Sequence, residues 1–218
     1  MRNKIFDYSF LALGLLIQVV TFVLNRHMVI GTDQLSVISL ISGCLGICSV
    51  CLTAQGNILT FLFGFAQVGT YTWLCILQRF YGGIAINAYY FLTMIYGVYA
   101  WSKRLKTPSV VTTRQLRPGL MAVIVLAVLA GSCLTGWGLA NWTSDTQPYL
   151  DAFTTIPALV AQALMILVYR EHWFLWLAVD VLSVVLWVRV GDWCMAAQYV
   201  FWSANCLYGL HRWKHLEN

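Results

Sequence analysis

One stretch of the sequence places an acid among tryptophans at helical spacing. In WFLWLAVDVLSVVLW, the residues Trp173, Trp176, Asp180, Ser183 and Trp187 are separated by 3, 4, 3 and 4 positions. This spacing puts all five side chains on one face of a helix. Asp180 lies mid-segment, where facing lipid would cost about 3 kcal/mol. The face therefore points toward other helices, either as a packing contact capped by a neighbouring hydroxyl or, as we prefer, as an aromatic-walled pocket with one acceptor.

A second polar face follows in QYVFWSAN, where Gln198, Trp202 and Asn205 are spaced 4 and 3 residues apart. Two amides beside a tryptophan can hydrogen-bond a polar, uncharged group such as a hydroxyl or a carboxamide. Each such residue could alone be an interhelical hydrogen bond, which is the commoner use. Similar candidates occur in the first half of the chain, and the distribution over both halves predicts a central binding cavity. These candidates are Gln67, Trp73, Gln78, Asn87 and Tyr90.

Motifs for other chemistries are not found in the sequence. There is no phosphate-binding glycine loop, no Ser/His/Asp arrangement and no HExxH motif. The seven cysteines form no CxxC, and the four histidines show no ligand spacing. We therefore expect no cofactor, no metal and no catalytic residues. An enzyme would need a nucleophile or an acid/base pair beside Asp180, and none is visible.

The composition indicates that most of the protein surface faces lipid and not water. Of the 218 residues, 60% are hydrophobic and 10% are charged, whereas soluble domains carry about 25% charged residues. The net charge of +5 could suggest a nucleic-acid partner. The basic residues, however, sit in short loops, where membrane topology explains them better. A structural membrane scaffold would not need polar faces in both halves.

Eight segments are apolar and long enough to cross a bilayer, which takes about 20 residues. Because backbone groups must be satisfied inside lipid, all eight are expected to be helices. We predict both termini and the loop Ser102–Pro118 in the cytoplasm, since all but Arg26, Arg79 and Arg189 of the thirteen Lys and Arg then lie inside. The predicted segments are 6–24, 35–54, 58–78, 84–102, 119–140, 151–169, 173–189 and 193–211.

A seven-residue sequence motif, called the repeated phrase below, occurs near the middle of the chain and again near its end. IYGVYAW, ending at Trp101, returns as LYGLHRW, ending at Trp213, a shift of 112 residues. Four segments separate the copies, so both run in the same direction, which is typical of a parallel repeat. We predict an extra N-terminal helix and loop (1–33), a first three-helix bundle (34–102), a cytoplasmic loop with a linker helix (103–150) and a second three-helix bundle (151–218).

This three-plus-one-plus-three arrangement resembles the SWEET sugar-transporter architecture. NAYYFLTMIYGVYAWSK (87–103), WFLWLAVDVLSVVLW (173–187) and NCLYGLHRWK (205–214) are more similar to the PnuC family of bacterial vitamin transporters, a resemblance that covers about 35–214. A proline often bends the first helix of each repeat in SWEET-type bundles. Pro157 fills this place in the second repeat, but Leu45 stands at the matching position in the first.

The resemblance implies facilitated diffusion of nicotinamide riboside across the bacterial inner membrane. It also implies a homotrimer, and trapping of the substrate by a separate cytoplasmic kinase that serves NAD biosynthesis. Related members carry thiamine or other nucleosides, so a related vitamin is the alternative substrate and a membrane enzyme the less favoured alternative. A flat cationic pyridinium ring suits stacking and cation–π contact with Trp and Tyr, and its ribose and carboxamide suit Asn and Gln.

Overall fold

The computed structural model of the chain describes residues 4–25, 33–77, 81–143, 147–190 and 193–216. Eight α-helices account for most of these residues, each within a few residues of a predicted segment, and the prediction of an all-α membrane protein is confirmed. The helices are α1 (Lys4–Asn25), α2 (Asp33–Ala54), α3 (Thr60–Leu77), α4 (Tyr81–Ser102), α5 (Pro118–Trp142), α6 (Pro148–Ile166), α7 (His172–Val190) and α8 (Trp193–Lys214).

Most of these helices are suited to a lipid environment. Within the described part of the chain, α1, α2, α3, α5, α6 and α7 are long and apolar enough to cross a membrane. The other two, α4 and α8, have 22 residues each, which gives about 33 Å of helix, but they carry more Tyr, Trp, Asn and Gln. Leucines such as Leu92, Leu126 and Leu134 are 66–70% exposed, and such side chains are stable on a surface that faces hydrocarbon.

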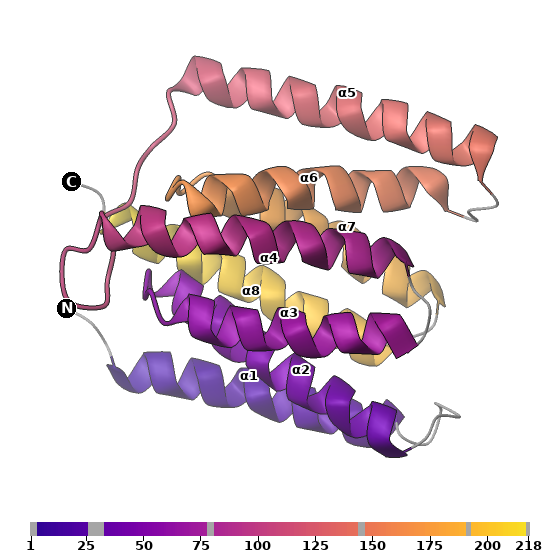
Figure 1. Cartoon of the computed structure of the whole chain (residues 1–218), viewed down its shortest axis with the longest axis horizontal. Helices are drawn as coiled ribbons and strands as arrows, with labels where there is room; N and C mark the ends of the chain where they lie inside the picture. The colour runs from indigo at the N-terminus through magenta and orange to yellow at the C-terminus, as the bar shows by residue number, and fades with distance from the viewer. Residues whose placement is uncertain (1–3, 26–32, 78–80, 144–146, 191–192, 217–218) are drawn as a thin grey trace. The chain divides into compact units, whose positions relative to one another are not determined.

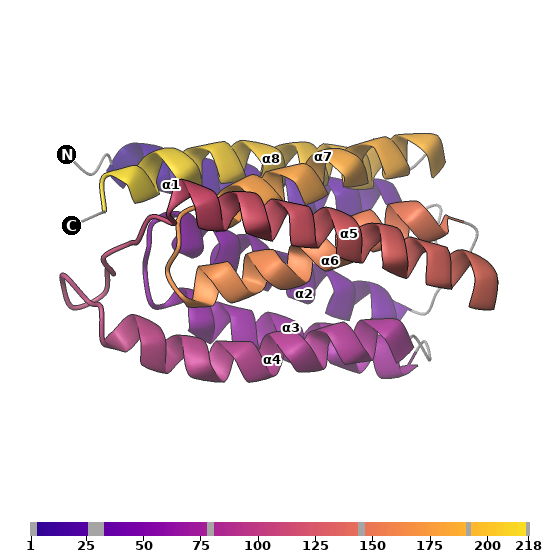
Figure 2. The ribbon, with the colours of Figure 1, turned by 90° about the horizontal axis from the view of Figure 1, so that it is seen from above.

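The chain divides into two compact units, Met1–Val111 and Thr112–Asn218. Within the first unit, α1 packs on α2, α2 on α3 and α3 on α4; within the second, α5 packs on α6, α6 on α7 and α7 on α8 (Figures 1 and 2). Helix α1 meets α2 at Gly43, where a Cβ would lie 2.1 Å from Nε2 of Gln18. Gly43 therefore admits the Gln18 side chain. Pro157, predicted in the first helix of the second repeat, lies buried inside α6.

The turns that follow α2 and α6 are also related by the 112-residue shift. After α2, the backbone N–H of Asn57 donates to Leu52 O at 2.9 Å; after α6, that of Tyr169 donates to Leu164 O at 2.9 Å. Each bond closes a Schellman motif at the helix C-terminus. The two motifs are related residue for residue by the shift seen in the sequence.

The loop between α4 and α5 is hydrogen-bonded to both turns, in an antiparallel direction at Asn57 and Val110 and in a parallel direction at Arg114 and Tyr169. In the first unit, Val111 N donates to Gly56 O at 3.0 Å and Ile58 N donates to Ser109 O at 2.8 Å. In the second unit, Arg114 N donates to Val168 O at 2.8 Å, and Arg114 O accepts from the N–H of Arg170, the counterpart of Ile58, at 3.0 Å. Each half of the loop thus closes the turn of its own unit.

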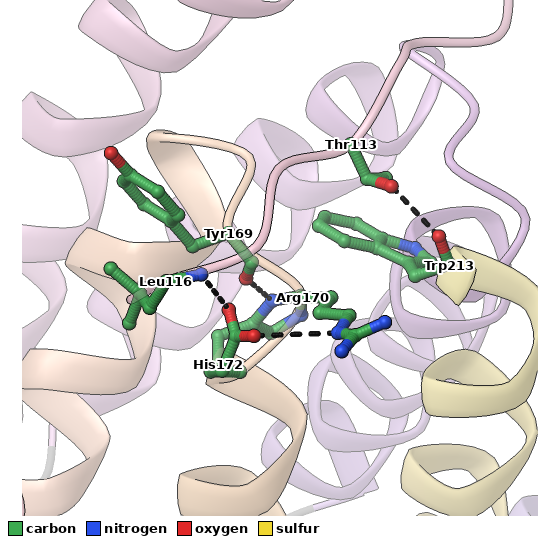
Figure 3. Close-up of polar contacts among 7 residues, drawn as sticks. Thr113, Leu116, Tyr169, Arg170, His172 and Trp213 are labelled. Atoms are coloured by element: carbon green, nitrogen blue, oxygen red, sulfur yellow. Dashed lines mark hydrogen bonds and ion pairs between the residues drawn. The ribbon is translucent and has the colours of Figure 1, made fainter. Parts of the chain in front are cut away.

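The C-terminal end of α8 is also held by this loop. Thr113 Oγ1 donates to Trp213 O at 2.7 Å (Figure 3), and Thr113 N donates to Leu216 O at 3.0 Å. The loop and the C-terminus consequently lie at the same end of the second unit, as the predicted topology requires. The membrane face to which this end belongs stays a prediction.

The repeated phrase supplies the aromatic core of each unit. Trp101 and Trp213 are both 0% exposed, so they are core residues and not interfacial anchors. Trp101 meets Phe61 edge to face, with ring centroids 5.1 Å apart, and Trp213 meets Trp173 in the same way at 5.9 Å. A Cβ on Gly209 would lie 2.4 Å from the Trp173 ring. This glycine of the phrase is therefore needed for close packing.

Candidate functional site

The interface between α7 and α8 contains a buried acid. Asp180 is 4% exposed, and its Oδ2 accepts a hydrogen bond from Sγ of Cys206 at 3.2 Å. Cys206 is equally buried. Because α7 and α8 are consecutive and pack against each other, they run antiparallel, and this bond fixes their register. Cys206 was not predicted as a site residue, because a contact across two helices has no signature within either one.

The remaining predicted residues of the second unit follow from this register. Three residues along α7, about 4.5 Å of rise, lead from Asp180 to Ser183. Four residues back along α8, about 6 Å, lead from Cys206 to Trp202. One further turn along α7 leads from Ser183 to Trp187, and one further turn back along α8 leads from Trp202 to Gln198. Cys206 and the predicted residues at neighbouring levels of the two helices are together called the α7–α8 strip: Asp180, Ser183, Trp187, Gln198, Trp202, Asn205 and Cys206.

Several polar groups of the α7–α8 strip have unused hydrogen-bonding capacity. Ser183 and Gln198 are 6% and 7% exposed, and neither side chain bonds to another residue that the structure describes. The same holds for Oδ1 of Asp180 and for Nε1 of Trp202, which is buried. Polar groups buried in a protein are normally satisfied. Of these atoms, Nε1 of Trp202 is the one fully buried without a partner, and open donors and acceptors at neighbouring levels are an arrangement expected of a ligand site.

Aromatic surface accompanies these polar groups. Trp187 is half-buried, and so is Trp202, whose ring meets Tyr199 edge to face at 4.9 Å. Asn205, also on α8, is 2% exposed. Aromatic faces next to an acid, a hydroxyl and amides can hold a flat ring that carries polar substituents.

Trp176 differs from the rest of the predicted α7 face. It is half-buried and packs against a core cluster made up of Leu116 of the loop, Ala161 and Leu164 of α6, and Leu175 of α7. This contact gives Trp176 a packing role. Whether Trp176 also touches a ligand stays a prediction.

The predicted site residues of the first unit are less concentrated. Asn87 is 4% exposed, and its Nδ2 donates to Gly83 O of its own helix at 2.8 Å. Gln67 and Tyr90 are half-buried. Trp73 is 54% exposed, so much of its ring faces away from the protein. Gln78 lies outside the described residues.

A second buried polar cluster lies where the loop meets the start of α7 (Figure 3). Glu171 is 6% exposed; its Oε2 accepts from Leu116 N at 3.0 Å, and its Oε1 is 3.3 Å from Arg170 Nε. His172 is 0% exposed, and its Nδ1 donates to Tyr169 O at 2.7 Å. The His172 ring lies 4.5 Å from that of Trp213. Sequence reasoning missed both residues, which hold the loop and the helix end together.

The family described as nicotinamide mononucleotide transporter matches residues 36–215. Among curated proteins, the chain is 30% identical over 221 residues to the nicotinamide riboside transporter PnuC of Haemophilus influenzae, covering 98% of this chain and 91% of that one. It is 27% identical over 222 residues to the protein of the same name from Neisseria mucosa, covering 97% and 81% of the two chains.

A solved structure is similar over nearly the whole chain. It is described as the crystal structure of the vitamin B3 transporter PnuC. The similarity has a TM-score of 0.77 at 28% sequence identity and covers 99% of this chain and 92% of that one.

Proposed function

We propose, from the premise that this chain belongs to the PnuC family of membrane transporters, that it carries nicotinamide riboside across the membrane by facilitated diffusion. Membership of a transporter family confirms the prediction that the chain is not an enzyme. The curated relatives are named nicotinamide riboside transporters, which supports this substrate over thiamine.

The observation that carries the proposal is the α7–α8 strip. Its Ser183 and Gln198 side chains are free to bond ribose hydroxyls and the carboxamide, and the rings of Trp187 and Trp202 offer faces for the nicotinamide ring. Such a solute has three ribose hydroxyls and a carboxamide to satisfy as it leaves water, and a strip of unused donors and acceptors meets that need. A binding cavity to which the first unit also contributes stays a prediction.

The passive mechanism rests on the charged groups of the strip. Within the described parts of α7 and α8, Asp180 is the single acid, and the basic residues lie at the helix ends. Proton relays in membranes use chains of ionisable residues, and sodium sites use unwound helices that expose carbonyls. Described α7 and α8 are continuous helices with one acid, an arrangement that favours equilibration over concentration.

Three further features follow from the family resemblance and are proposed with it. The protein acts in the bacterial inner membrane as a homotrimer. A cytoplasmic kinase phosphorylates the incoming nucleoside, and the added charge prevents its return. The transporter itself makes no covalent change to the substrate.

Proteoliposomes loaded with the purified protein test this function. Labelled nicotinamide riboside should reach equal concentrations inside and outside, with or without a pH or sodium gradient, and thiamine in excess should leave the uptake rate unchanged. Encapsulating a nicotinamide riboside kinase with ATP should convert equilibration into continued accumulation. Uptake of thiamine in preference, or accumulation driven by a gradient without the kinase, would contradict the proposal.

A further inference from the structure

We infer that Asp180 is a specificity-determining residue that selects the positively charged ring of the ligand over uncharged analogues of the same shape. The inference rests on the proposed function, because it takes nicotinamide riboside as the ligand. It goes beyond that function by assigning charge discrimination to one side chain.

The first observation is that Asp180 has no cationic partner. Among the residues that the structure describes, its carboxyl group accepts one hydrogen bond, from the Cys206 thiol at 3.2 Å, and no Lys, Arg or His pairs with it. A buried carboxylate without a counter-charge is costly. A monocationic ligand would supply the missing charge.

The second observation is an internal comparison that the repeat provides. The position equivalent to Asp180 in the first unit is Val68, which is also 4% exposed, and the position equivalent to Cys206 is Met94, which is 6% exposed. The same place in the same helix pair is thus filled by an apolar pair in one unit and by an acid and a thiol in the other. The fold does not require an acid here, so packing does not explain Asp180.

The third observation is that the neighbours of Asp180 carry no charge. Ser183 and Gln198 offer a hydroxyl and an amide, which bond neutral and cationic ligands alike, and the Trp202 face adds a cation–π preference of its own. Asp180 is therefore the residue of the strip whose full charge can make the larger contribution to discrimination by charge. A hydrogen bond or contact that involves a charged group contributes about 1.5–3 kcal/mol, which corresponds to a preference of roughly 10- to 100-fold.

A pair of ligands separates charge from shape. Nicotinamide riboside and benzamide riboside share the flat aromatic ring, the ribose and the carboxamide, but a carbon atom replaces the charged ring nitrogen in the neutral form. We expect the wild-type chain, purified at full length, to bind the cationic form roughly 10- to 100-fold more tightly by calorimetry. Asp180→Asn, which is nearly isosteric, should remove most of this preference by weakening the cationic form alone.

Two variants serve as controls. Gln198→Leu removes a neutral hydrogen-bonding group of the same strip and should weaken both forms equally, leaving their ratio unchanged. Asp180→Glu retains the charge and should retain a preference for the cationic form. Size-exclusion profiles and melting temperatures establish that each variant is folded.

The outcomes separate this inference from the proposed function. Suppose that wild type binds nicotinamide riboside, but that folded Asp180→Asn keeps the full preference or loses affinity for both forms equally. The inference is then overturned and the proposed function stands. If neither Asp180→Asn nor Asp180→Glu folds, Asp180 serves packing and the inference is again overturned. A wild-type chain that binds neither form would overturn both proposals.

Discussion

Gly56 and Val168 adopt the same left-handed backbone conformation, with φ values of 65° and 66°, at positions 112 residues apart. Each is the residue after the C-cap of its helix, where glycine is preferred because it has no Cβ. Val168 is β-branched and 0% exposed, so the second unit accepts a conformation that costs about 1–2 kcal/mol in an L-residue. The turn geometry is therefore more strictly maintained between the repeats than the residue type.

Gly56→Ala should lower stability, because a Cβ must enter the left-handed region. We expect a loss of about 1 kcal/mol and a lower melting temperature by tryptophan fluorescence in detergent. Gly69→Ala is the matched control in the same unit: Gly69 lies in helix α3, and a Cβ there meets nothing within 4 Å. That change should be neutral or stabilise the helix by up to about 1 kcal/mol. Equal effects of the two changes would contradict the explanation.

Gly209→Ala should disrupt the aromatic core of the second unit. The new methyl group would lie 2.4 Å from the Trp173 ring, and overpacking of this kind costs about 1–3 kcal/mol. Thermal unfolding should show a clear loss of stability. Gly119→Ala, where a Cβ meets nothing within 4 Å, should not, and an unaffected Gly209→Ala variant would show that the Trp173 ring can move aside.

Glu171→Ala should free the loop that precedes α5, because the buried N–H of Leu116 loses its acceptor. The expected loss is about 1–3 kcal/mol, with faster trypsin cleavage at Arg114 or Arg117. Glu171→Gln keeps an acceptor oxygen and should fall between wild type and alanine. Leu59 occupies the equivalent position in the first unit and is 48% exposed, so Leu59→Ala should leave cleavage unchanged. Unaltered cleavage in Glu171→Ala would show that other contacts hold the loop.

Trp202→Ala should weaken ligand binding by about 1–3 kcal/mol, the scale of base–aromatic stacking. Trp202→Phe keeps an aromatic face but removes the unsatisfied Nε1–H, and should cost less. Trp176→Ala should behave differently, lowering the melting temperature because Trp176 packs on the core cluster. Calorimetry and thermal unfolding measure the two effects. A Trp202→Ala variant with wild-type affinity would place the ligand elsewhere.

Reporter fusions at residue 110 and at the C-terminus should give the same answer, because the loop residue Thr113 is hydrogen-bonded to Leu216 O at 3.0 Å. The distribution of Lys and Arg predicts that this answer is the cytoplasm. A second reporter enzyme, active only outside the cytoplasm, should be inactive when it is fused at either point. Opposite answers at the two points would contradict the arrangement of the second unit.

The helices and their repeat could be predicted from the sequence because both depend on local patterns. Apolar length predicted all eight helices, and the phrase ending in Trp101 and Trp213 gave the 112-residue shift. That phrase did not reveal what the tryptophans do, since a tryptophan near a helix end can anchor at the lipid interface or fill a core. Burial decided between them, and burial depends on the partners Phe61 and Trp173, which are distant in sequence.

For the candidate site, the sequence predicted a shared helix face. Asp180 and Ser183 are both buried, and Asp180 contacts α8 through Cys206, while their role in ligand binding stays a prediction. Trp176 and Trp73 show the limit of this reasoning, because helical period does not tell which neighbour a face meets. Cys206 shows another limit: its bond to Asp180 depends on the register between two helices.

The Asp180 and Val68 positions have a consequence for the origin of the fold. Two identical repeats can contribute an even number of acids at equivalent positions, either none or two. The fused chain, with Val68 in one repeat and Asp180 in the other, has an odd number. Fusion of the two repeats into one polypeptide thus allows a single acid at this place, the number that would match the proposed monocationic ligand, which an assembly of identical halves could not provide.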